Sequence, residues 1–210
     1  ETVGIMLQSI GAQTEGRFLS NAESNYMSTH ANRNIMGLVF NCIAAVYMLS
    51  KFICEIDKYD FAEAIKNCLI NDEETANRLA TFYKRCKKYG KSASSSQALF
   101  SLVFPPTFCY YRKVDDEFVI NGNKIKVDPV QIKEGILISG VLTKADVGPV
   151  GNSIIHFMHK EFNPNIVSRF FTEAQFICDW YIKWHGLSFT YKDCRPSDEI
   201  RNKIKKITKR

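Results

Sequence analysis

The chain has 210 residues, 45% hydrophobic content and a modest net charge of +6, which allow a sizeable core in one or two domains. The longest apolar run, at 35–49, is too short to span a membrane, and no membrane partner is expected. Seven cysteines are scattered without a Cys-x-x-Cys pair, which excludes a zinc ribbon or thioredoxin-like motif and is typical of a reducing, intracellular compartment.

The first part of the chain is predicted to be helical. Hydrophobic periodicity predicts an amphipathic helix at 12–22, and clustered turn-forming residues then predict a loop at 24–34. Residues 36–50 are apolar nearly all round, which predicts a buried helix. Another helix is expected at 59–70.

The next predicted helix begins at a cap, Asn71 or Asp72, and ends at Lys88. Its inward side is predicted to consist of three large apolar residues: Leu79, Phe82 and Tyr83. Cations gather near its carboxyl end, where they complement the helix dipole and need no ligand: Lys84, Arg85, Lys87 and Lys88.

The second half is predicted to combine strands with helices. A short capped helix at 96–106 is stopped by proline. Strands are then expected at 108–113, 117–120, 124–127, 136–139 and 141–144. Asn121-Gly122 between two of them is the strongest hairpin signal in the chain. The predicted fold is therefore α+β, with helices around a small antiparallel sheet or partial barrel.

Further helices are expected to complete the chain. One opens at 152–156, a long aromatic helix covers 166–185, and Pro196 precedes a last helix with acids first and bases later. Trp180 and Trp184 in the aromatic helix indicate a core or a subunit interface rather than base stacking. Residues 201–210 hold six bases and no acid, which is typical of a solvated helix face and would also favour a polyanion.

Few residues suggest chemistry of their own. His156 and His159 lie at i, i+3 with Glu161 nearby, so they could share a metal, although a packed role for His156 is favoured. The turn from Gly148 to Gly151 follows a predicted strand, which favours a structural turn over a nucleic-acid clamp. No catalytic trio has supporting local context, and the isolated chain is expected to catalyse nothing.

The stretch from Gly135 to Asp193 carries an ordered set of motifs. A Gly-x-Leu-x-Lys hairpin, a Gly-rich turn and Ile-Ile-His at a helix start precede a helix that ends in Trp-Tyr, then Gly-Leu-Ser and Asp. These positions are Gly140, Leu142, Lys144, Gly148, Ile154, Ile155, His156, Trp180, Tyr181, Gly186, Leu187, Ser188 and Asp193. Their order and spacing resemble the largest (β-prime class) subunit of multisubunit DNA-directed RNA polymerases.

The beginning of the chain resembles the segment that follows the catalytic Asp-Phe-Asp-Gly-Asp loop of that family. The matching positions are Ala12, Gln13, Glu15, Arg17, Asn25, Ser28, Asn32, Met36 and Gly37. The resemblance implies that Glu1 directly follows the last aspartate of that loop, so that the chain is a piece of a longer protein. Phe40 and Asn41 replace the family's Gln-Asp, and Thr190 and Lys192 replace two of its glycines. The resemblance is weakest at 50–95.

The resemblance implies a division of the chain into parts of a polymerase. Residues 1–33 would end the active-site domain, 34–185 would form the pore domain that lines the secondary channel, and 186–210 would begin the funnel. The enzyme would make RNA from nucleoside triphosphates on a DNA template, with two Mg²⁺ ions held by aspartates outside this chain. Implied partners are the second-largest and smaller subunits, DNA template, RNA and a transcript-cleavage factor in the channel.

The resemblance also assigns residues to roles. Candidates for the pore rim are Ser188, Lys192 and Asp193. The structural motif positions are Gly37, Gly140, Lys144, Gly148, His156 and Gly186. No metal ligand and no cofactor are expected within the chain itself.

Divergence from the family pattern, with abundant Lys, Asn and Ile, indicates a polymerase of a large cytoplasmic DNA virus, similar to asfarviruses. Such an enzyme would work in host cytoplasm and be packaged in virions. The alternative is a free-standing α+β module that binds nucleic acid or protein through 201–210. A polymerase piece would expose apolar surface meant for other subunits, whereas a module would bind with strongly salt-dependent affinity.

Overall fold

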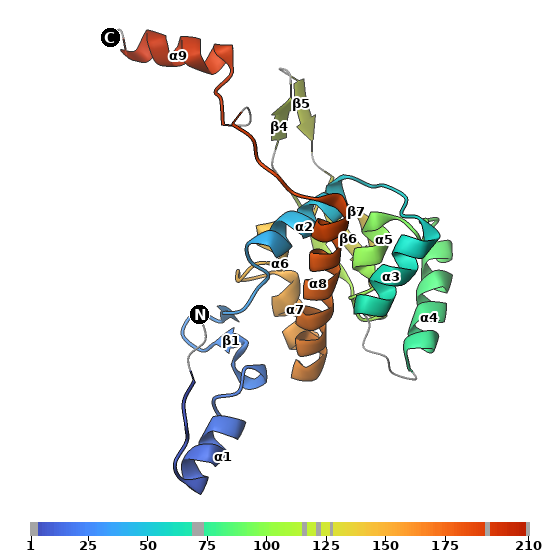
Figure 1. Cartoon of the computed structure of the whole chain (residues 1–210), viewed down its shortest axis with the longest axis vertical. Helices are drawn as coiled ribbons and strands as arrows, with labels where there is room; N and C mark the ends of the chain where they lie inside the picture. Colours follow the sequence, from blue (N-terminus) through green and yellow to red (C-terminus); the bar gives the residue numbers. More distant parts are fainter. Residues whose placement is uncertain are drawn as a thin grey trace.

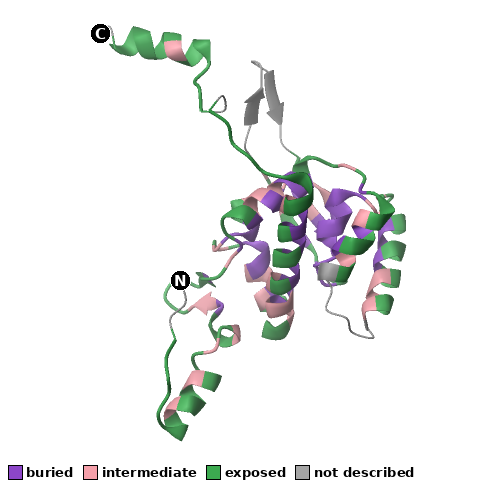
Figure 2. Cartoon of the chain, viewed as in Figure 1, coloured by how far each residue is buried: buried purple, intermediate pink, exposed green. Residues whose placement is uncertain are grey.

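The computed structural model describes residues 4–68, 74–114, 117–120, 123–126, 128–191 and 194–208. A helical body contains α2 to α8, while α1 and α9 extend away from it at opposite ends of the view (Figure 1). Burial follows this division, because the body holds most of the buried residues and neither α1 nor α9 contains one (Figure 2). Within the described residues, no helix combines the length and the apolarity that a membrane span requires.

The described elements have the following bounds. The helices are α1 (Ile10–Phe18), α2 (Asn41–Lys51), α3 (Lys58–Cys68), α4 (Glu74–Lys88), α5 (Ser96–Ser101), α6 (Lys144–Val147), α7 (Ile154–Glu161), α8 (Pro164–His185) and α9 (Asp198–Thr208), with a 3-10 turn η1 (Glu23–Asn25). The strands are β1 (Met27–Ser28), β2 (Arg33–Asn34), β3 (Tyr110–Arg112), β4 (Glu117–Ile120), β5 (Asn123–Lys126), β6 (Val130–Lys133) and β7 (Ile136–Ser139).

The long helix α8 lies at the centre of the body, and its bounds agree with the aromatic helix predicted at 166–185. Pro164 occupies its first position, where a missing N–H costs nothing. Most of its buried residues recur every three to four positions and face α2, α3, α5 and α7: Val167, Phe170, Ala174, Ile177, Cys178 and Tyr181. The helix ends at Gly186, whose φ of 80° favours glycine.

The α+β class is confirmed, but the single sheet or partial barrel is not. Strand β6 pairs with β3 on one side and β7 on the other, both antiparallel, while β4 and β5 form a separate antiparallel pair. The β4–β5 pair confirms the predicted hairpin; its turn residues Asn121 and Gly122 lie outside the described residues. Strand β6 was not predicted from the sequence.

The strand predicted at 141–144 is wrong, because these residues lead into helix α6. The backbone of Thr143 donates to Asp146 Oδ2 at 2.8 Å, and the two residues form a capping box. The preceding Gly140 has a φ of 87°, and a Cβ there would lie 2.6 Å from Val130 Cα. A tight turn at Gly140 and the start of α6 therefore take the place of the strand predicted at 141–144, which was the second strand of the Gly-x-Leu-x-Lys hairpin.

The buried helix predicted at 36–50 is wrong in its first turn. Helix α2 begins only at Asn41, because Phe40 has a φ of 51° and its side chain is 88% exposed. The preceding Leu38 donates its N–H to the carbonyl of Val147 at 2.8 Å instead of to a helical carbonyl. A long-range contact therefore outweighs the apolar character of this stretch.

The N-terminal elements differ from the predictions in their bounds. Helix α1 begins before the predicted residue 12, since Ser9 caps it by accepting the N–H of Ala12 at 3.1 Å. It ends at Phe18 rather than at residue 22. The loop predicted at 24–34 contains the turn η1 and the short antiparallel pair of β1 and β2.

Helix α4 confirms the predicted helix, although its proposed caps, Asn71 and Asp72, lie outside the described residues. Phe82 is buried, but Tyr83 is 45% exposed, so its inward assignment is wrong. Arg85 is also buried, and its Nη1 donates to the carbonyl of Glu134. Arg85 therefore connects α4 to the turn before β7. It is not a solvent-exposed cation that only complements the helix dipole.

Burial also governs the reactivity of Cys86 on the same helix. It raises the pKa of this thiol to about 11, so the thiol stays protonated and unreactive at about pH 8. We expect iodoacetamide at about pH 8 to alkylate the exposed Cys109 and Cys194 well before Cys86, as measured by peptide mass spectrometry. Alkylation of all three at one rate in the folded chain would contradict this, and denaturation by urea should equalise the rates.

Candidate functional site

The segment before α2, residues 34–38, contacts the turn before α7, residues 147–153. We call this contact the joint, and Asn34 is at its centre. Asn34 is 1% exposed, and its Nδ2 donates to the carbonyls of Met36 at 2.7 Å and Gly148 at 3.0 Å. Its Oδ1 accepts from Ser153 Oγ at 3.1 Å. Ser153 in turn caps α7 by accepting the N–H of His156 at 3.3 Å. One amide side chain therefore fixes two segments far apart in the sequence.

Two of the predicted motif glycines meet at this joint. A Cβ on Gly37 would lie 2.3 Å from Pro149 N and 2.4 Å from Gly148 C. A Cβ on Gly148 would lie 2.4 Å from the carbonyl oxygen of Lys144. Both glycines are therefore required by close approach of backbone segments.

The predicted motif residue Lys144 opens α6 and has an exposed side chain. Its backbone carbonyl accepts the N–H of Gly148 at 2.9 Å, so its contribution to the joint is through the main chain. The charged residue that matters here is Asp146, which is fully buried and was not singled out by the sequence. Arg112 donates Nε to Asp146 Oδ1 at 2.6 Å and Nη2 to Oδ2 at 2.8 Å.

Tyr110 adds to this buried pair. Its hydroxyl lies 3.3 Å from Asp146 Oδ1 and 3.3 Å from the carbonyl of Asn152, to either of which it can donate. Burial, and then the negative charge of Asp146, raise the pKa of the Tyr110 hydroxyl, which keeps it protonated as a donor. This cluster supports the joint structurally and has no reacting group exposed to solvent.

The two histidines of α7 have separate structural contacts. His156 Nδ1 accepts the backbone N–H of Asn152 at 3.3 Å, whereas the His159 ring meets Tyr26 edge to face at 6.3 Å. Among the described residues, no group of three or more His, Cys, Asp or Glu side chains could hold a metal ion. The contacts of His156 agree with a packed histidine near the joint.

The carboxyl end of α8 forms an aromatic cluster. The rings of Trp180 and Trp184 are stacked at 5.6 Å, and Trp184 Nε1 donates to Asp60 Oδ2 at 2.9 Å. Trp180 is buried and Trp184 is 40% exposed, so the cluster continues from the core to the surface. Helix α8 is capped by Gly186, where an added Cβ would meet no atom within 4 Å.

The pore-rim candidates lie beyond this end. Ser188 is exposed on the segment that leads from α8 to α9 (Figure 1). Lys192 and Asp193 lie outside the described residues. The structure therefore brings Gly37, Gly148 and His156 together, whereas Gly140, Gly186 and Ser188 belong to other parts of the chain.

Sequence reasoning also missed the residue at the centre of the joint. It selected Asn32, which is exposed with a φ of 44°, whereas Asn34 is the buried residue two positions later. The available signal was a polar residue directly before an apolar run at 35–49. Such a residue has to satisfy its amide groups if the run is buried.

The sequence matches the model of one protein family over residues 25–194, described as RNA polymerase Rpb1, domain 3. This range covers most of the chain and includes the joint and all of α8. It also includes the motif stretch 135–193, on which the resemblance to the largest polymerase subunit depends. The chain therefore belongs to the RNA polymerase Rpb1 domain 3 family and is a piece of the largest subunit of DNA-directed RNA polymerase, a nucleotidyltransferase.

Proposed function

We propose that residues 34–185 form the pore domain of the polymerase, which lines the secondary channel where nucleotides enter and cleavage factors insert. Residues 1–33 then end the active-site domain, and 186–210 begin the funnel. The family match, over residues 25–194, supports one domain that includes the helical body and the joint in front of it. The two ends that extend from the body support it as well.

The observation that carries the proposal is the exposure of large apolar side chains on these two ends. Ile5, Met6 and Ile10 are each more than 80% exposed, and Phe189 is 80% exposed. Water-exposed apolar surface of this extent is typical of a surface that other protein covers. The ends therefore fit contacts with the rest of the largest subunit, the second-largest subunit and the smaller subunits.

The proposed reaction is RNA synthesis on a DNA template, with RNA and a transcript-cleavage factor as further partners of the enzyme. Mg²⁺ is the metal expected in that reaction, where two ions stabilise the attacking and leaving oxygens. The described residues do not fit a Mg²⁺ site, since no three potential ligands converge among them. On the resemblance to the polymerase family, we assign the ions to aspartates outside this chain.

An obstruction experiment at Ser188 tests the pore assignment. An azide-bearing amino acid at this position of the assembled polymerase is coupled to a large polyethylene glycol chain, and RNA synthesis is measured against nucleotide concentration. We expect the apparent KM for nucleotides to rise about threefold or more, because the polymer narrows their path, while kcat changes less. The control carries the same polymer at Ser92, an exposed serine between α4 and α5.

Equal effects at positions 188 and 92, or no effect at either with complete coupling, would contradict the pore assignment. The alternative of a free-standing module gains no support from the family match, which concerns the largest polymerase subunit.

The proposal extends to the source of the enzyme, a large cytoplasmic DNA virus similar to asfarviruses. Its support is sequence divergence at Phe40, Asn41, Thr190 and Lys192, where the family has other residues. A polymerase of this kind is recovered from infected cytoplasm and from virions. Recovery of the native enzyme from nuclei alone would contradict the proposal.

A further inference from the structure

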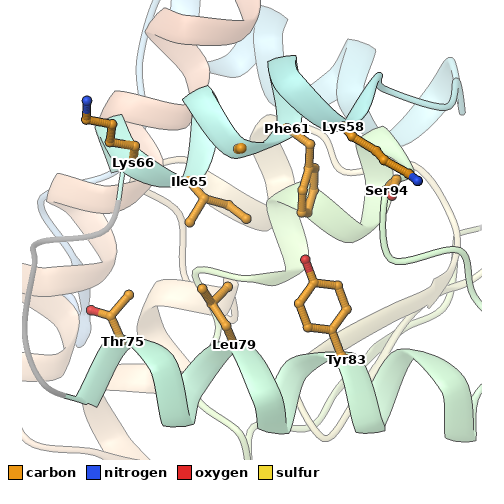
Figure 3. Close-up of a pocket in the computed structure, with 9 residues that line it drawn as sticks. Lys58, Phe61, Ile65, Lys66, Thr75, Leu79, Tyr83 and Ser94 are labelled. Atoms are coloured by element: carbon orange, nitrogen blue, oxygen red, sulfur yellow. The ribbon is translucent and has the colours of Figure 1, made fainter.

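A groove separates helices α3 and α4. Figure 3 shows Phe61 and Ile65 projecting from α3 toward Leu79 and Tyr83 on α4. The cavity between them has a volume of about 600 Å³. Its floor is apolar, and Ala62 completes the α3 side.

The groove exposes side chains that a third element would cover. Phe61 is buried, but Ile65 and Leu79 are only partly buried, and Tyr83 is 45% exposed. Ala62 is exposed. Along α4 the groove residues Leu79 and Tyr83 are four apart, so they form one continuous stripe of the helix surface.

Both helices are anchored on their other sides, so the groove does not close by a simple shift of either one. On α3, Asp60 accepts from Trp184 Nε1 at 2.9 Å. On α4, Arg78 donates to both carboxylate oxygens of Glu173 at 2.5 Å. The cavity residues on α4 run from Thr75 to Tyr83, about 12 Å of helix, which matches about two turns of a docked helix.

The described residues that line the cavity include two bases and no acid. Both bases, Lys58 and Lys66, are on the α3 side. Asp60 faces Trp184, and Glu63 is exposed without lining the cavity. An occupant with acidic flanks would therefore be attracted, and a basic one repelled.

We propose that the groove binds an amphipathic helix of another protein of the transcription machinery, with an apolar face and acidic flanks. Two parallel helix walls around an apolar floor are the usual receptor for such a helix, which docks residues at i, i+3, i+4 and i+7. Helix α9 of this chain is a poor occupant, because its apolar stripe is flanked by bases: Arg201, Lys203, Lys205 and Lys206. The same argument disfavours a second copy of the chain that docks through α9.

Crosslinking in the assembled polymerase identifies the occupant. The photoreactive residue p-benzoylphenylalanine replaces Tyr83, which faces the groove, or Lys84, which is the next residue and turns away from it by about 100°. We expect position 83, and not position 84, to crosslink to a helix with acidic residues in another subunit or factor. A crosslink to α9, to a second copy, or to no protein at position 83 would overturn the proposal.

A binding measurement with the 210-residue chain tests the charge argument. The probe is a fluorescein-labelled helical peptide with leucines at i, i+4 and i+7 and glutamates on its flanks; a scrambled peptide of the same composition is the control. Lys58→Glu should weaken binding of the probe about tenfold, since attraction becomes repulsion at the groove. Lys84→Glu, the same charge change on an exposed residue outside the groove, should weaken it less than about twofold.

Both substituted lysines are exposed, so the variants should keep the circular dichroism spectrum of the original chain. Equal weakening by the two variants would reduce the effect to net charge and overturn the proposal. Equal binding of the scrambled peptide, or no binding of the probe to the original chain, would overturn it as well.

Discussion

Replacing Glu173 by glutamine is expected to destabilise the chain by about 3 kcal/mol. Glu173 is 0% exposed in the middle of α8, and it accepts from Arg78 at both oxygens and from Arg169 Nε at 2.8 Å. Glutamine has one acceptor oxygen and no charge, so the guanidinium groups lose their buried counter-ion. Removing one member of a buried ion pair costs more than the pair contributes, since the remaining charge keeps its desolvation penalty.

The stability change is measured by urea denaturation of the 210-residue chain, followed by the fluorescence of Trp180 and Trp184. Glu161→Gln is the matched control, because Glu161 is an exposed residue at the end of α7. We expect it to change the free energy of unfolding by less than about 0.5 kcal/mol. A similarly small change for Glu173→Gln would show that the arginines find other partners and would contradict the assignment.

The Glu173 variant also has a local consequence for α4. Arg78 connects α4 to α8 through this carboxylate, and it also donates Nη2 to the carbonyl of Leu102 at 2.8 Å. Loss of the carboxylate should therefore loosen α4 before the remainder of the body. Hydrogen exchange that accelerates in α4 more than in α7 would be the sign of this order.

Replacing Gly37 by alanine is expected to destabilise the chain by about 3 kcal/mol through steric conflict at the joint. The added Cβ would lie 2.3 Å from Pro149 N and 2.4 Å from Gly148 C, both backbone atoms of one turn. The segment before α2 must then move away from this turn. That movement breaks the hydrogen bond from the Leu38 N–H to the Val147 carbonyl, which is 2.8 Å long. It also strains the hydrogen bond from Asn34 Nδ2 to the carbonyl of Gly148.

Gly151→Ala is the control for this prediction. Gly151 lies in the same turn region, but a Cβ there would meet only Arg33 Cβ, at an ordinary 3.7 Å, and its φ is not positive. Urea denaturation gives the stability change, and hydrogen exchange of the Leu38 amide shows whether the joint has opened. Equal stability of the two variants, with a protected Leu38 amide in both, would contradict the steric argument.

Local sequence patterns determined three of the helices, one hairpin and the family. Helices α3, α4 and α8 were predicted close to their observed positions, since each has a long periodic apolar stripe. The Asn121-Gly122 signal predicted the β4–β5 hairpin correctly, because turn chemistry is local. The family followed from ordered motifs, and the match over residues 25–194 confirms it.

Only the tertiary structure decided how these elements are joined. The apolar residues 36–40 are helical in pattern, yet their backbone contacts the turn at 147–149, more than a hundred positions away in the sequence. Arg85 was predicted to be a solvated cation, but it is buried and donates to the carbonyl of Glu134. Glu173 and Asp146 are buried, and each is paired with an arginine from another element. Gly37 and Gly148 were named from the sequence, but their contact with each other was not. Periodicity and turn signals report the preferences of neighbouring residues, whereas buried charges and close backbone contacts depend on partners that only the folded chain brings together.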